Sequence, residues 1–85
     1  MSRIEIYTTE MCPYCIMAKE LLEEKGIEIE EIRVDLDRRR MVEAVARSGG
    51  RRTVPQIFID NRHIGGYDDL CALEDGGKLD ELLSF

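Results

Sequence analysis

Two cysteines three residues apart, Cys12 and Cys15, stand where a strand pattern in the sequence changes into a helix pattern. Before them, residues 4–9 alternate between apolar and polar side chains, which predicts a β-strand with one buried face. After them, apolar residues recur at helical spacing as far as Lys25, and Gly26 follows as a helix stop. The chain is therefore expected to place a C-x-x-C pair at the start of a helix that follows directly on a strand.

That position gives the two thiols different chemistry. A cysteine at a helix N-terminus lies beside unpaired backbone N–H groups and the positive end of the helix dipole, and both stabilise an anion. Cys12 is therefore predicted to have a lowered pKa and to attack disulfides as a thiolate. Cys15 lies one turn further on the same face, close enough to form a disulfide, and shares the buried stripe of Ala18 and Leu22. We expect Cys15 to be the resolving thiol, while Pro13 fits the first helical turn, where its missing N–H is not needed.

The same cysteine spacing also occurs in zinc sites. A structural zinc ion takes four ligands, and only His63 and Cys71 remain to complete the set. We therefore expect redox chemistry and no metal. Cys71 is expected to be a small buried apolar residue rather than a second redox centre, and His63 a structural residue of a strand.

The remaining pattern predicts a single domain over residues 1–85 with the order β-α-β-α-β-β-α. The expected elements are a strand around Ile32 and Val34, a helix with a buried stripe of Met41, Val42, Val45 and Ala46, strands at 56–59 and 62–64 joined by an Asp60-Asn61 turn, and a helical end from an Asp68 N-cap to Leu83. A helix between the first two strands makes those strands parallel.

Charge excludes some classes of protein. The net charge of −6 argues against a nucleic-acid-binding protein, because phosphate contacts need a basic surface. No apolar run is long enough to span a bilayer, and no signal-peptide pattern is present, so we expect a cytoplasmic protein without a membrane partner. We also expect a monomer. Locally, six arginines between Arg38 and Arg52 face the single acid Glu43. Most of them are expected on a solvated helix face, and the alternative is a site for a small carboxylate ligand.

Two further motifs each leave two interpretations open. The proline of Thr53-Val54-Pro55 either marks a sheet edge or follows a cis bond that exposes the backbone of Val54 to an extended peptide thiol. The run Gly65 to Asp69 is either a loop with an ordinary helix cap, which is the preferred interpretation for the run alone, or a site for the charged end of an amino acid.

Together the motifs Cys12-Pro13-Tyr14-Cys15, Thr53 to Ile59 and His63 to Leu70 resemble a dithiol glutaredoxin of bacterial type. The resemblance covers almost the whole chain. It implies an α/β thioredoxin-like fold, with a four-stranded mixed sheet flanked by helices and a cis bond before Pro55. It also implies a glutathione-dependent thiol–disulfide oxidoreductase that reduces protein disulfides and glutathionylated proteins, with glutathione as co-substrate and no other cofactor.

The resemblance also implies which residues bind each part of the glutathione molecule. Thr53 and Val54 would hold its cysteinyl part through their backbone, and Tyr67 and Asp68 its γ-glutamyl end. Tyr14, Pro55 and Gly66 complete the implied site. The family commonly has lysine where this chain has Thr9, which leaves the glycyl carboxylate of glutathione without its usual cation.

Arg40 and Arg52 are the candidates to replace that cation, because one lies in the second helix and the other directly precedes Thr53. Two rival functions are a redoxin reduced by thioredoxin reductase and an iron–sulfur carrier. The glutathione-type residues from Gly65 to Asp68 argue against the first, and Pro13 argues against the second.

Overall fold

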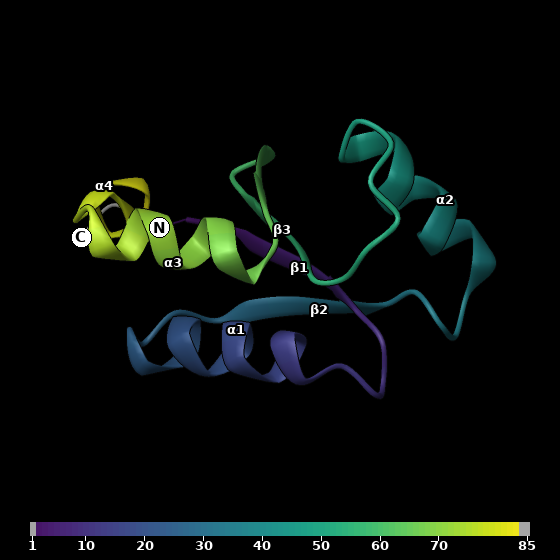
Figure 1. The fold of residues 1–85 in the computed structure, drawn as a ribbon, viewed down its shortest axis with the longest axis horizontal. Coiled ribbons are helices and arrows are strands. Elements are labelled where there is room, and N and C mark those ends of the chain that lie inside the picture. The colour runs from purple at the N-terminus through teal and green to yellow at the C-terminus, as the bar shows by residue number, and fades with distance from the viewer. Residues whose placement is uncertain (1, 84–85) are drawn as a thin grey trace.

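The computed structural model describes residues 2–83, so Met1, Ser84 and Phe85 of the expected 1–85 domain lie outside the described part. Its elements follow in the order β1 (Ile4–Thr8), α1 (Pro13–Glu24), β2 (Ile29–Arg33), α2 (Arg38–Arg47), β3 (Gln56–Ile59), β4 (Arg62–Gly65), α3 (Tyr67–Asp75) and α4 (Lys78–Leu82) (Figure 1). The predicted order is confirmed up to its last helix, where Gly76 and Gly77 divide the helical end into α3 and α4. None of these helices has the length and hydropathy that crossing a bilayer requires.

One mixed sheet in the order β2-β1-β3-β4 forms the centre of the fold. β1 runs parallel to β2 and antiparallel to β3, and β4 pairs antiparallel with β3. Asp60 and Asn61 both have positive φ, of 50° and 68°, as the tight turn between β3 and β4 requires. The four-stranded sheet confirms the expected thioredoxin-like α/β class. The sheet places the C-terminal end of β1 beside the start of β3. The cysteine loop follows Thr8 there, and Pro55 directly precedes Gln56.

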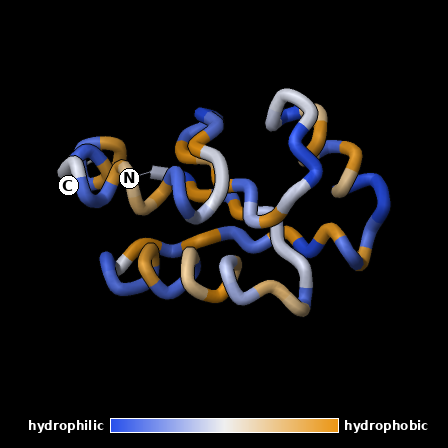
Figure 2. The backbone as a smooth tube through the Cα atoms, viewed as in Figure 1, coloured by the Kyte–Doolittle hydropathy of each residue, from blue (hydrophilic) through white to orange (hydrophobic). Residues whose placement is uncertain are grey.

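The first face of the sheet is covered by α1, α3 and α4. Ile4, Ile6, Ile57 and Ile59 alternate along β1 and β3, and they pack against Ala18 and Leu22 of α1, Leu70 of α3, and Leu79 and Leu83 at the C-terminal end. Figure 2 shows that hydrophobic and hydrophilic residues alternate along these helices, as expected for helices with one face on the sheet. This apolar layer anchors α1 and therefore fixes the position of its first turn.

The second face of the sheet differs from the sequence expectation. The alternating pattern predicts one buried face for β1, yet Glu5 and Tyr7 are buried as well. The reason is Arg47 of α2, which donates to both carboxylate oxygens of Glu5 at 3.1 and 3.2 Å and to the Tyr7 hydroxyl at 2.8 Å. The Arg47 guanidinium also lies 4.0 Å from the ring centroid of Phe58. A charged residue pair thus closes a face that the alternating pattern assigned to solvent.

The orientation of α2 follows from the same contact. Met41 and Ala44 face Tyr7, Ile32, Val34 and Phe58, whereas Val42 is 63% exposed and Ala46 is exposed as well. The predicted stripe of Met41, Val42, Val45 and Ala46 is therefore wrong in part. The helix is rotated so that Ala44 and Arg47 approach the sheet, because Arg47 must reach Glu5.

Candidate active site

Cys12 occupies the N-cap of α1, one residue before Pro13. Its backbone is extended, with φ −139° and ψ 94°, and its Sγ accepts a hydrogen bond from the backbone N–H of Cys15 at 3.1 Å. This is the place that a capping side-chain oxygen takes in other helices, and here a sulfur fills it. The backbone N–H of Cys15, in the first turn of α1, therefore points at the sulfur, where it and the helix dipole favour the anionic form.

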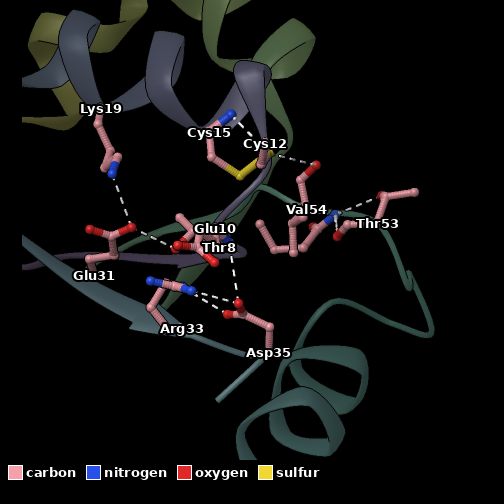
Figure 3. Close-up of a disulfide and its surroundings, with 11 residues drawn as sticks. Thr8, Glu10, Cys12, Cys15, Lys19, Glu31, Arg33, Asp35, Thr53 and Val54 are labelled. Carbon is pink, nitrogen blue, oxygen red and sulfur yellow. Dashed lines mark hydrogen bonds and ion pairs between the residues drawn. A yellow bond between two sulfur atoms is a disulfide. The ribbon is translucent and has the colours of Figure 1, made fainter. Parts of the chain in front are cut away.

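The two cysteines form a disulfide with their Cα atoms 5.2 Å apart (Figure 3). Cys15 is 1% exposed and belongs to the buried stripe of α1 with Ala18 and Leu22, as predicted. Cys12 keeps more exposure, at 8%. The difference makes Cys12 the sulfur that a large substrate reaches first.

The Val54–Pro55 peptide bond is cis, which decides between the two interpretations that the sequence left open. The carbonyl oxygen of Val54 lies 3.9 Å from the Sγ of Cys12, as Figure 3 shows. The loop before β3 thus presents its backbone directly beside the Cys12 sulfur.

Gln56 holds that loop from the sheet. Its Nε2 donates to the Thr53 carbonyl at 3.0 Å and to the Thr53 hydroxyl at 3.2 Å, and its Oε1 lies 2.7 Å from Nε2 of His63. With Gln56 in this orientation, His63 donates from Nε2. Desolvation lowers the pKa of His63, which favours the neutral form of the ring. His63 is thus structural, as expected, and its structural role is to fix Gln56.

A cavity of about 190 Å³ opens beside the disulfide. Its lining includes seven of the residues predicted for glutathione: Tyr14, Thr53, Val54, Pro55, Gly66, Tyr67 and Asp68. Arg51 and Asp69 complete the lining, whereas Arg40 and Arg52 are not part of it. Arg40 instead pairs with Glu43 at 3.1 Å, and Arg52 is exposed.

Arg51 and Asp69 connect the two walls of this cavity. Oδ2 of Asp69 accepts the backbone N–H of Gly66 at 2.9 Å and lies 3.3 Å from Nη1 of Arg51. The hydrogen bond from the Gly66 N–H holds the pKa of Asp69 below its usual range, and Arg51 acts in the same direction with a smaller effect. The predicted cap, Asp68, is therefore wrong, because Gly66 is the N-cap and the carboxylate of Asp69, at the third helical position, accepts the N–H of the cap residue. Sequence spacing offered the signal, since Asp69 stands three residues after Gly66.

Gly65 is required by the same arrangement. Its φ is +117°, and a Cβ at this position would lie 2.2 Å from Oδ2 of Asp69. We expect Gly65→Ala to lower the free energy of unfolding by about 2–3 kcal/mol, from the left-handed backbone and the displaced carboxylate together. Urea unfolding measures the loss.

Gly77→Ala is the matched control for that prediction, because Gly77 has φ +72° and a Cβ added there would meet nothing within 4 Å. Backbone strain alone applies there, and the expected loss is about 1 kcal/mol. Equal losses in the two variants would contradict the close contact between Gly65 and Asp69.

Paired charges support the loop that precedes Cys12 (Figure 3). Asp35 accepts the backbone N–H of Glu10 at 3.3 Å and pairs with Arg33 at 2.6 Å, and Arg33 lowers the pKa of Asp35 to about 2. Lys19 pairs with Glu31 at 3.0 Å. The cations drawn on this side of the nucleophile are thus already engaged with carboxylates.

Cys71 is half-buried rather than buried, and it is the free cysteine of the described chain. It lies one turn after Tyr67 in α3, and a hydrogen bond with Cys71 raises the pKa of the Tyr67 hydroxyl. The expectation of a fully packed thiol is therefore wrong. The tyrosine that lines the cavity covers Cys71 only in part.

A thioredoxin-like sheet with a dithiol at the N-terminus of its first helix and a cis-proline loop beside it defines a thiol–disulfide oxidoreductase. The glutaredoxin family model matches residues 4–64, and the chain belongs to the glutaredoxin family. It is accordingly a dithiol oxidoreductase that works through Cys12 and Cys15.

Relatives support the assignment over nearly the whole chain. Glutaredoxin 3 of Escherichia coli K12 is 54% identical over 83 residues, which covers 98% of this chain and 99% of the relative. The solution structure of a Brucella melitensis glutaredoxin is 53% identical with a TM-score of 0.83, covering 95% of this chain and 87% of that one. A buckwheat glutaredoxin–glutathione complex is 28% identical with a TM-score of 0.88, covering 98% and 77%.

Proposed function

We propose that this glutaredoxin binds glutathione in the cavity beside Cys12 and transfers it between thiols. The observation that carries the proposal is the position of the Cys12 sulfur, which accepts the Cys15 N–H at 3.1 Å and lies 3.9 Å from the carbonyl oxygen of Val54, a residue that lines the cavity. A thiolate there is stabilised by the helix N-terminus and lies next to a cavity whose lining carries both polar backbone and charge.

Each part of glutathione has a matching group in the cavity. Thr53 and Val54 offer extended backbone for the cysteinyl part, next to the Cys12 sulfur. The first turn of α3, at Tyr67 and Asp68, offers backbone N–H groups for the γ-glutamyl carboxylate, and the Asp68 side chain offers a carboxylate for the ammonium group. Tyr14 and Tyr67, whose ring centroids lie 6.1 Å apart, also line the cavity, together with Pro55.

The reaction with a glutathionylated protein takes two exchanges. The Cys12 thiolate attacks the glutathione sulfur, the Cys12–glutathione disulfide forms, and the protein thiolate leaves. A second glutathione thiolate then attacks the bound glutathione sulfur, which releases glutathione disulfide and the reduced Cys12 thiolate. With a protein disulfide, Cys12 first forms a mixed disulfide with the substrate, and the Cys15 thiolate displaces the substrate to leave the Cys12–Cys15 disulfide. In this proposal the physiological substrates are disulfide-bonded or glutathionylated proteins. The enzyme acts on them as a monomer in the cytoplasm.

Trapping the intermediate tests this proposal. Cys15→Ser protein mixed with glutathione disulfide is expected to gain one glutathione, and peptide mapping is expected to place it on Cys12. The Cys12→Ser variant is the control, since its remaining thiols, Cys15 and Cys71, are less exposed or lie outside the cavity. Glutathione on Cys71 in place of Cys12 would contradict the proposed site.

A separate proposal concerns the cation that binds the glycyl carboxylate of glutathione, for which Arg40 and Arg52 are the candidates. We expect Arg40→Ala or Arg52→Ala to raise the KM for glutathione severalfold, because an exposed ion pair contributes about 0.2–1 kcal/mol. The effect should shrink in about 0.5 M salt, because the contact is screened. Thr9→Lys, which restores a cation before Cys12, should lower that KM modestly. Steady-state kinetics at low and high salt measure all three variants.

Arg51 is the matched comparison, because it lines the cavity and is paired with Asp69. If Arg51→Ala alone raises the KM while the other two arginine variants and Thr9→Lys change nothing, Arg51 rather than Arg40 or Arg52 holds the carboxylate.

A further inference from the structure

Charge is divided between the two ends of the molecule. Residues 66–83 carry six acidic side chains against the single base Lys78, whereas residues 38–52 carry six arginines against Glu43. Figure 1 shows α2 and the α3–α4 pair at opposite ends of the long axis, which extends 34 Å. The hydrogen bond from the Glu10 N–H to Asp35 places the loop before Cys12 beside the connection that leads into α2. The nucleophile is therefore next to the basic end of an acidic protein.

Only part of this positive charge is used inside the molecule. Arg40, Arg47 and Arg51 are paired with Glu43, Glu5 and Asp69. Within residues 2–83, Arg38 makes no ion pair, and the Arg39 side chain is 92% exposed with a single ion-pair contact, to Asp37 at 3.5 Å. The free charge of α2 is thus concentrated in its first turn.

Helix stability does not account for arginines at that place. Arg38 and Arg39 are the first two residues of α2, and the N-terminus of a helix favours acidic side chains. Two positive charges there oppose the helix dipole and repel each other. These two arginines therefore weaken the helix, and we take them to serve the binding of another molecule rather than the stability of the fold.

Large apolar side chains accompany this charge at the surface. Met11 is 89% exposed and directly precedes Cys12, and Leu36 is 74% exposed and follows Asp35, which holds the same loop. Val42 is 63% exposed and lies one turn after Arg38 and Arg39. Two of the acids nearby are engaged, since Asp35 pairs with Arg33 and Asp37 caps α2 through the Arg39 N–H. Apolar contact area and unpaired positive charge together are typical of a docking surface.

We propose that a surface beside Cys12 binds protein substrates whose reactive cysteine is flanked by acidic and apolar residues. This α2 docking surface consists of Met11, Leu36, Arg38, Arg39 and Val42. The chemistry rests on the proposed function, and the surface adds selection among its substrates. Opposite charge raises the rate of encounter, and the apolar side chains hold the substrate chain beside Cys12.

Two glutathionylated peptides of equal length test the docking surface, one with Glu and Leu around its cysteine and one with Lys and Leu. At saturating glutathione and low salt, kcat/KM is expected to be about tenfold higher for the acidic peptide, and the ratio should fall toward one in about 0.5 M salt. The variant R38E/R39E is expected to lose or invert the preference while its midpoint of thermal unfolding rises, because the new charges suit the helix dipole. R38A/R39A repeats the test without new acids.

The matched control is R62E/K78E, which changes net charge equally at the start of β4 and α4, away from Cys12. Its peptide preference should equal that of the unmodified protein, and all variants should reduce the small mixed disulfide of glutathione and 2-mercaptoethanol alike. Equal rates on both peptides, or equal loss in the control, would overturn the docking surface while the proposed function stands. Failure of the unmodified protein on the small mixed disulfide would overturn the proposed function and this inference with it.

Discussion

Cys12→Ser is expected to lower turnover of every disulfide substrate by at least about 1000-fold, because removing a nucleophile removes the covalent pathway itself. The helix N-terminus that stabilises a thiolate cannot make a serine hydroxyl a comparable nucleophile, since the hydroxyl stays protonated near neutral pH. Cys15 cannot replace Cys12, because it is 1% exposed and lies on the inner face of α1. Coupled assays with a glutathione mixed disulfide and with a protein disulfide measure the loss.

Cys15→Ser separates the two reactions in the same assays. Reduction of the mixed disulfide should continue, since a second glutathione completes that cycle, and reduction of the protein disulfide should fall strongly, since no resolving thiol remains. Cys71→Ala is the control, with a rate expected within about twofold of the unmodified protein, because Cys71 lies outside the first turn of α1 and its N–H groups. Full mixed-disulfide activity in Cys12→Ser would contradict the assignment of the two thiols.

Arg47→Ala is expected to lower the free energy of unfolding by about 2–4 kcal/mol, because it leaves the buried carboxylate of Glu5 without its two hydrogen bonds from Arg47 and with only the more distant Arg3, at 3.7 Å, as an ion-pair partner. Glu5 accepts both Arg47 contacts at 3.1 and 3.2 Å, and its side chain is only 9% exposed. The change also removes the guanidinium from Phe58 and Tyr7. Urea denaturation measures the effect.

Two comparisons make the Arg47 prediction specific. Arg39→Ala changes the same charge on the same helix at a side chain that is 92% exposed, and its stability should change by less than about 0.5 kcal/mol. The double variant Glu5→Gln/Arg47→Met should recover part of the loss, because no charge then stays buried alone. A loss no larger in Arg47→Ala than in Arg39→Ala would show that α2 is held by apolar contacts alone.

Local signals were enough to predict the site around the disulfide. Pro13 and the change from strand to helix pattern located the first turn of α1, and the stripe of Ala18 and Leu22 correctly made Cys15 buried. The cis bond before Pro55 was not available from spacing. It came from the resemblance of the three motifs to a family, because a proline before a strand fits either isomer.

Long-range pairing accounts for the features that the sequence missed. Whether Glu5 is buried depends on Arg47, which is 42 residues away, and no periodicity in β1 contains that information. Arg51 forms its ion pair with Asp69, which lies 18 residues further along the chain. His63 is linked to Thr53 through hydrogen bonds to Gln56. Binary patterns assign faces to elements by themselves, so they fail where a charged pair decides which face is buried.

The measurement that tests the central claim most directly is the source of electrons. The unmodified protein should reduce a glutathione mixed disulfide rapidly with NADPH, glutathione reductase and glutathione, at a rate that saturates with glutathione, and should show little turnover with NADPH and thioredoxin reductase. Turnover that requires thioredoxin reductase and is indifferent to glutathione would contradict a glutathione site beside Cys12.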